Sequence, residues 1–96
     1  MMKKYKVYVV DDDRTVLDTL DKQLKKTYEV TCFVAPERCL SKALDEQCDL
    51  LIADINMPQM DGIALLSEFR KYYPLTPVLI LTGFGSVSIA KKAISM

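Results

Sequence analysis

Two short apolar runs in this chain each end at aspartate, and this pattern limits the folds that the chain can adopt. Residues 7–10 precede three consecutive aspartates at 11–13, and residues 50–53 precede Asp54. Short apolar runs followed by polar residues are typical of buried strands in a parallel sheet. If the two strands are neighbours, their carboxylates meet at one edge of the sheet. Two carboxylates about 4 Å apart repel by roughly 4 kcal/mol at an effective dielectric constant of 20, so such a cluster calls for a cation.

The remaining sequence alternates between strand and helix patterns, which predicts an α/β fold with a parallel sheet. We expect strands at 5–10, 29–33, 49–54 and 78–82. We expect helices at 14–26, from Pro36 through Leu44, between Asp61 and Pro74, and at 86–94. Asp13 directly precedes the first helix, where an aspartate caps free backbone N–H groups and is favoured by the helix dipole. Asp61 is expected to cap the third helix in the same way.

Length and composition indicate one small intracellular domain. The chain has 96 residues, with 13 basic and 13 acidic side chains, so its formal net charge of zero argues against direct nucleic-acid binding. No apolar run approaches the roughly 18 residues that a membrane span requires, so we expect a soluble, cytoplasmic protein. Cys32, Cys39 and Cys48 lack metal-ligand spacing, and the chain has no histidine, so we expect buried thiols in a reducing compartment.

Three sequence blocks, in this order and spacing, resemble those of response regulator receiver domains. The blocks are Val9-Val10-Asp11-Asp12-Asp13, Asp54 with Asn56-Met57-Pro58 and Asp61-Gly62, and Leu81-Thr82-Gly83. The resemblance extends from about Tyr5 to the last residue and implies a flavodoxin-like, doubly wound parallel sheet. Receiver domains have the strand order 2-1-3-4-5, in which strands one and three are neighbours and ligands bind beyond their carboxyl ends. This chain would supply strands 2-1-3-4.

The resemblance also implies a chemistry for the acidic residues. Asp54 would accept a phosphoryl group from a sensor histidine kinase, and the domain would then be an acceptor, with self-catalysed phosphorylation and dephosphorylation, and not an enzyme. Mg²⁺ would be bound directly by Asp12, Asp54 and the backbone carbonyl of Asn56, with Asp11 acting mostly through water. The Thr82 hydroxyl would bond to the phosphoryl group and switch the conformation of the domain. Capping by Asp11 and Asp12, and a plain strand role for Thr82, are the structural alternatives.

The sequence departs from the family pattern at its carboxyl end. Receiver domains continue with a fifth strand that ends in Lys-Pro and a fifth helix, whereas this sequence ends at Met96, within or just after the fourth helix. Lys91 and Lys92 lie in that helix and do not match the family's lysine. We therefore expect residues 1–96 to be a receiver domain that lacks the fifth strand and helix, with an effector domain beyond residue 96. The open edge of the fourth strand predicts a homo-oligomer or an element-swapped dimer.

Two other functions remain open at the level of the sequence. Without the family's lysine, the chain could be a phosphorylation-impaired, receiver-like assembly module that acts through protein contacts. A phosphatase of the haloacid dehalogenase type also uses an aspartate nucleophile and Mg²⁺. That class requires a second acid two residues after the nucleophile, where this chain has Asn56. Modification of Asp54 would distinguish a working receiver from an assembly module, and turnover of a phosphomonoester would favour the phosphatase.

Overall fold

The structure, a computed structural model, describes residues 4–54 and 62–81 and contains a sheet flanked by helices. Its elements are β1 (Lys6–Val10), α1 (Arg14–Leu24), β2 (Glu29–Phe33), α2 (Pro36–Asp45), β3 (Leu50–Asp54), α3 (Gly62–Tyr72) and β4 (Val78–Leu81). The expected elements up to residue 81 are confirmed, with small differences at their ends. The first helix, expected at 14–26, ends at Leu24. Lys25 is its C-cap and donates its backbone N–H to the Asp21 carbonyl, at 2.9 Å. The helix expected at 86–94 and the cap expected at Asp61 lie outside the described residues.

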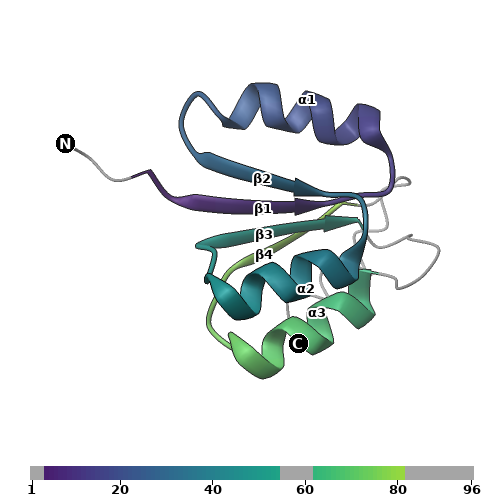
Figure 1. The fold of residues 1–96 in the computed structure, drawn as a ribbon, viewed down its shortest axis with the longest axis vertical. Helices are drawn as coiled ribbons and strands as arrows, with labels where there is room; N and C mark the ends of the chain where they lie inside the picture. Colours follow the sequence, from purple (N-terminus) through teal and green to yellow (C-terminus); the bar gives the residue numbers. More distant parts are fainter. Residues whose placement is uncertain (1–3, 55–61, 82–96) are drawn as a thin grey trace.

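The sheet has the order β2-β1-β3-β4, and all three strand pairs are parallel. Helix α1 covers one face of the sheet, while α2 and α3 cover the other (Figure 1). This is the doubly wound, flavodoxin-like arrangement that the sequence predicts. In the register between β1 and β3, Val10 lies opposite Ala53. Asp11 and Asp54 follow these two residues directly, so the topology brings the first and third strands' acidic ends together.

The two central strands are buried on both sides, which fixes their carboxyl ends in space. Side chains of β1 and β3 pack against those of α2 and α3 in the larger core, whose most buried members include Tyr8, Leu51, Leu65, Leu66 and Phe69. A smaller core lies between the sheet and α1 and contains Val7, Val9, Leu17 and Ile52. On α1, Leu17 is buried, whereas Leu20 and Leu24 pack against this smaller core and are partly buried.

Polar contacts tie β1 to the α2–β3 connection at the end of the sheet opposite the aspartates. The Tyr8 hydroxyl donates to the Glu46 carbonyl at 2.6 Å, and Lys6 forms an ion pair with the Glu46 carboxylate. The Lys6 backbone N–H also donates to the Asp49 carboxylate at 2.7 Å. Burial raises the pKa of the Tyr8 hydroxyl, so it remains a proton donor at neutral pH. These contacts hold β1 and β3 in register.

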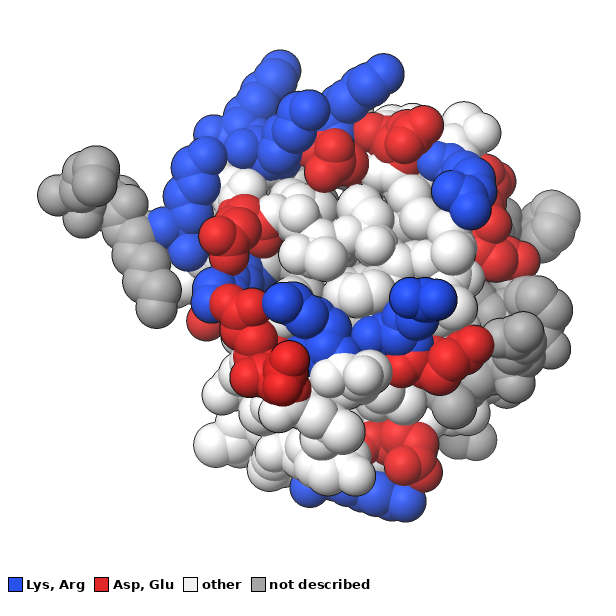
Figure 2. Space-filling model, in the orientation of Figure 1, with Lys and Arg blue, Asp and Glu red and all other residues white. Residues whose placement is uncertain are grey.

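The structure shows the distribution of surface charge and the burial of the cysteines. The face seen in Figure 2 carries both basic and acidic side chains, with several basic side chains grouped at the upper left. The cysteine thiols are free; Cys39 and Cys48 are buried as expected, whereas Cys32 on the edge strand β2 is only partly buried. Burial raises the pKa of Cys39 to about 12 and that of Cys48 to about 11. Among the described residues, no helix is long and apolar enough to span a membrane.

The Tyr8 hydroxyl provides a direct test of this packing. Tyr8→Phe removes the donor to the Glu46 carbonyl and keeps the aromatic ring, so the free energy of unfolding should fall by about 1 kcal/mol. Urea unfolding followed by circular dichroism measures the change. Tyr5→Phe is the matched control because Tyr5 is 66% exposed, and it should have no measurable effect. Equal stability of the two variants would contradict the role assigned to the Tyr8 hydroxyl.

Candidate functional site

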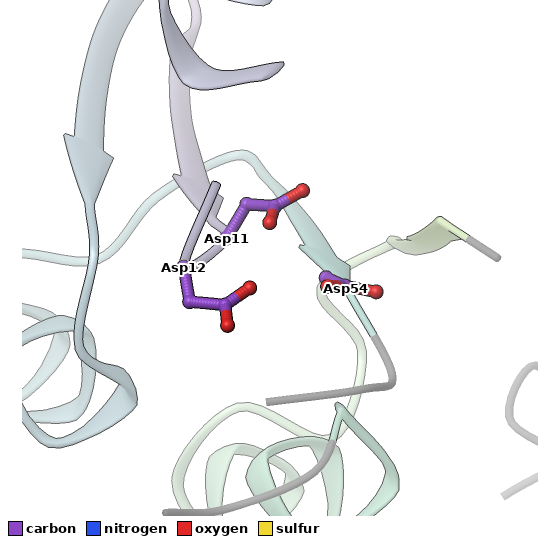
Figure 3. Close-up of side chains that lie close together, drawn as sticks. All are labelled: Asp11, Asp12 and Asp54. Atoms are coloured by element: carbon purple, nitrogen blue, oxygen red, sulfur yellow. The ribbon is translucent and has the colours of Figure 1, made fainter. Parts of the chain in front are cut away.

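Three aspartates gather at the carboxyl end of the two central strands. Asp11 and Asp12 lie in the turn that follows β1, and Asp54 is the last residue of β3. One carboxylate oxygen from each lies within 4.8 Å of the others, and Figure 3 shows the first two side chains extending from their turn toward the end of β3. Asp11 is 4% exposed, Asp54 is partly buried and Asp12 is exposed. The structure thus confirms that these carboxylates converge.

Asp13 organises the turn from which Asp11 and Asp12 project. It is the N-cap of α1, and its carboxylate accepts a hydrogen bond from the Thr15 backbone N–H at 2.9 Å. Its own backbone N–H donates to an Asp11 carboxylate oxygen, also at 2.9 Å. The cap predicted at Asp13 is confirmed, and it is therefore Asp13 that caps α1 in place of Asp11 or Asp12. The sequence analysis did not predict the hydrogen bond from the Asp13 backbone N–H to the Asp11 carboxylate. The three consecutive aspartates before a helix were the only sequence feature that pointed to it.

The cluster changes the acidity of its most buried member. Burial raises the pKa of Asp11 to about 6 from an ordinary value of 3.8, and the negative charges of Asp54 and Asp12 act in the same direction. The backbone N–H of Asp13 opposes them because it stabilises the ionised form. Burial and repulsion between carboxylates thus outweigh that single hydrogen bond. A cation at the cluster would reverse the balance by favouring all the ionised forms.

The donor set fits a hard divalent cation. The cluster offers only carboxylate oxygens. Mg²⁺, Ca²⁺ and Mn²⁺ prefer oxygen ligands, whereas softer metals prefer sulfur or nitrogen. One carboxylate is buried and another is exposed, so a bound cation would be held by protein oxygens and still reach solvent. That arrangement suits Mg²⁺, which usually retains several waters and uses one or two carboxylates. The acidic cluster can therefore bind a cation next to a reactive carboxylate.

Two predicted site residues, Asn56 and Thr82, lie outside the described residues. Thr82 directly follows Leu81, the last residue of β4, and Leu81 lies opposite Asp54 in the parallel register of β3 and β4. Two clefts among the described residues lie elsewhere. One cleft of about 500 Å³ lies beside β2, and another of similar volume lies at the end of the sheet where β3 and β4 begin. Neither cleft includes an aspartate of this cluster in its lining.

Comparison with known proteins gives the same family as the sequence blocks. Residues 7–96 match the response regulator receiver domain family. The chain is 36% identical over 93 residues to the DNA-binding transcriptional regulator NtrC of Proteus hauseri. The aligned region covers 96% of this chain and 20% of that protein. It is 39% identical over 89 residues to the response regulator protein FleR of Pseudomonas aeruginosa, covering 92% of this chain and 19% of that protein. The chain thus spans about one fifth of these relatives.

Solved structures show the same relationship in three dimensions. The chemotaxis response regulator CheY4 of Vibrio cholerae is 31% identical and superposes with a TM-score of 0.88, covering 96% of this chain and 81% of that one. The beryllofluoride-activated receiver domain of DrrB, at 24% identity and a TM-score of 0.85, covers 97% of this chain and 78% of that one and supports the fold. The chain therefore belongs to the response regulator receiver domains of two-component signalling, which are phosphoryl acceptors and not conventional enzymes.

Proposed function

We propose that Asp54 accepts a phosphoryl group from a phosphohistidine of a sensor histidine kinase. The convergence of three carboxylates at the end of β1 and β3 carries this proposal. An Asp54 carboxylate oxygen forms a bond to phosphorus while the P–N bond to the kinase's histidine breaks. The electron pair of that bond remains on the imidazole nitrogen, which then takes a proton from solvent. A carboxylate nucleophile needs no neighbouring base, so the lack of histidine in this chain is no obstacle.

The cation proposed for this site is Mg²⁺, which when bound neutralises and aligns the phosphoryl oxygens. Asp12 and Asp54 would be direct ligands, together with the backbone carbonyl of Asn56, and Asp11 would act mostly through water. The structure supports this division because Asp12 is exposed while Asp11 is buried and already accepts one hydrogen bond. Asp11 thus contributes charge and orientation from inside the protein, and Asp12 faces the solvent from which the cation arrives.

Thr82 is the proposed switch residue. It follows the strand that pairs with β3, and the residue before it lies opposite Asp54. A threonine hydroxyl can donate a hydrogen bond to a phosphoryl oxygen on Asp54. Such a bond exists only in the phosphorylated state, so it would favour one conformation over another, and this difference is what a conformational switch requires. The response of the domain would then depend on the hydroxyl, while the chemistry would depend on the carboxylates.

We further propose the setting in which this receiver works. Its phosphoryl donor, a histidine kinase, places it in the cytoplasm, where the free thiols of the chain also remain reduced. The much longer relatives favour a regulator in which an effector domain accompanies the receiver. Within the described residues β4 is an edge strand, and its Leu79 is 49% exposed, which favours pairing of two copies or exchange of elements there. The receiver itself would contact proteins and not nucleic acid.

Phosphorylation of Asp54 tests the proposed function directly. Incubation with acetyl phosphate and Mg²⁺ should add one phosphoryl group to the chain, as measured by intact mass spectrometry. Asp54→Ala should abolish the addition, and removal of Mg²⁺ with EDTA should reduce it strongly because the phosphoryl charge is no longer neutralised.

The matched control for this experiment is Asp45→Ala, which removes an exposed carboxylate at the end of α2. This variant should be phosphorylated as well as the unaltered chain. Phosphorylation that persists in Asp54→Ala would assign the acceptor to another residue. A chain that takes no phosphoryl group and does not respond to beryllofluoride would instead be an assembly module.

The raised pKa of Asp11 predicts a pH-dependent stability in the absence of metal. Between pH 4 and about 6 the unfolded carboxylate ionises before the folded one, so the folded state loses stability as the pH rises. Asp11→Asn removes this loss. The free energy of unfolding of Asp11→Asn minus that of the unaltered chain should be near zero at pH 4 and rise to about 2 kcal/mol at pH 7 in EDTA.

Denaturant unfolding across this pH range measures the difference between the two proteins. Excess Mg²⁺ should reduce this difference in the free energy of unfolding at pH 7. Only the unaltered chain can stabilise its folded state by binding the cation with all its carboxylates. Asp45→Asn serves as the control and should show no trend with pH. A difference that stays flat from pH 4 to 7 would show that the cluster does not strain Asp11.

The role of Thr82 separates switching from chemistry. Thr82→Ala should accept beryllofluoride at Asp54 but show a smaller conformational response, because the hydroxyl no longer distinguishes the two states. Thr82→Ser keeps the hydroxyl and should retain most of the response. Amide NMR spectra with and without beryllofluoride measure it. A full response from Thr82→Ala would remove Thr82 from the switch.

A further inference from the structure

The turn between β1 and α1 contains three consecutive acids, and the proposed cation chemistry uses only the first two. Asp13 is exposed, yet its backbone and its side chain are both engaged in hydrogen bonds. Its backbone is extended, with φ −89° and ψ 107°, whereas the helix begins at the next residue. Asp13 therefore lies at the junction between the metal-binding turn and the helix.

The hydrogen bonds of Asp13 join the Asp11 carboxylate to the first turn of α1. The Asp13 carboxylate accepts from the Thr15 N–H at 2.9 Å, and its carbonyl accepts from the Leu17 N–H at 3.1 Å. These two bonds fix the backbone of Asp13 against the helix. From this position its N–H points at an Asp11 carboxylate oxygen, at 2.9 Å. Asp12 lies between two residues that are both held, so its position is limited as well.

We infer that Asp13 is a positioning residue for the cation site. Its carboxylate holds the turn in which its own N–H orients Asp11 and in which Asp12 is presented to the cation. This inference rests on the proposed function, because it assumes that the cluster binds Mg²⁺. The capping bond orders the ligands before the cation arrives, so binding loses less conformational entropy. Asp13 would thus raise the affinity for the cation without touching it.

Three substitutions distinguish positioning from the effect of charge. Asp13→Ala removes the cap, Asp13→Asn keeps an oxygen acceptor and removes the charge, and Asp13→Ser keeps a shorter acceptor. Mg²⁺ affinity is measured by calorimetry on the full chain at high ionic strength, where exposed charges are largely screened. Asp13→Ala should bind Mg²⁺ about fivefold more weakly, a change of the size that loss of a cap produces. Asp13→Asn and Asp13→Ser should each stay within about twofold of the unaltered chain, because both residues cap helices about as well as aspartate does.

A second variant separates positioning from general loss of stability. Tyr8→Phe is expected to destabilise the chain to a similar extent, but it acts at the opposite end of the sheet. It should leave Mg²⁺ affinity unchanged. If Tyr8→Phe weakens Mg²⁺ binding as much as Asp13→Ala does, the effect is one of stability and the inference is wrong. It is also wrong if Asp13→Asn and Asp13→Ala weaken binding equally, since charge alone would then account for the result.

Hydrogen exchange in the metal-free protein gives a readout that does not depend on the cation. The Asp13 amide should be protected in the unaltered chain and in Asp13→Asn, and it should exchange faster in Asp13→Ala. Unchanged protection in Asp13→Ala would overturn the inference. Failure of the proposed function gives a different result: the unaltered chain itself would bind no Mg²⁺, whereas failure of the inference leaves binding by the unaltered chain intact.

Discussion

Repulsion among carboxylates held close together is the constraint on which the rest of the structure depends. Asp11, Asp12 and Asp54 are adjacent because β1 and β3 are parallel neighbours that end at the same edge of the sheet. The unfolded chain keeps these charges apart in water, so folding must supply the energy that gathers them. Burial of both faces of β1 and β3 against α1, α2 and α3 provides it. Burial, together with the negative charges of Asp54 and Asp12, raises the pKa of Asp11, so keeping this carboxylate ionised costs free energy in the metal-free protein.

The two ends of the sheet carry different interactions. Where β1 and β3 begin, the Tyr8 hydroxyl and the Lys6 backbone meet acceptors from the α2–β3 connection, which holds the strands in register. Where they end, the carboxylates of Asp11, Asp12 and Asp54 gather. The parallel pairing of β1 and β3 places Asp11 and Asp54 side by side at that end. At this end, Asp13 connects the acidic turn to α1 through two hydrogen bonds, one to the Asp11 carboxylate and one from the Thr15 backbone N–H.

The sequence predicts those parts of the molecule that depend on local patterns. Strand and helix periodicity, the proline at the start of α2 and the aspartate before α1 each have a short-range physical cause, and the structure confirms them. Contacts between a side chain and a distant backbone carbonyl leave no such pattern. The bond from the Tyr8 hydroxyl to the Glu46 carbonyl is one example, and the bond from the Tyr73 hydroxyl to the Ala43 carbonyl is another. Convergence of the aspartates was predictable only because topology makes strands one and three neighbours.

The central claim is that this strained cluster is a binding site for a divalent cation beside a nucleophilic carboxylate. Mn²⁺ prefers the same oxygen ligands as Mg²⁺ and is visible by its anomalous scattering, so a crystal structure of the chain grown with Mn²⁺ tests the claim most directly. The account predicts one anomalous peak within about 2.1 Å of carboxylate oxygens of Asp12 and Asp54. A peak elsewhere, or an Asp54 side chain turned away from Asp11 and Asp12 with no cation bound, would contradict it.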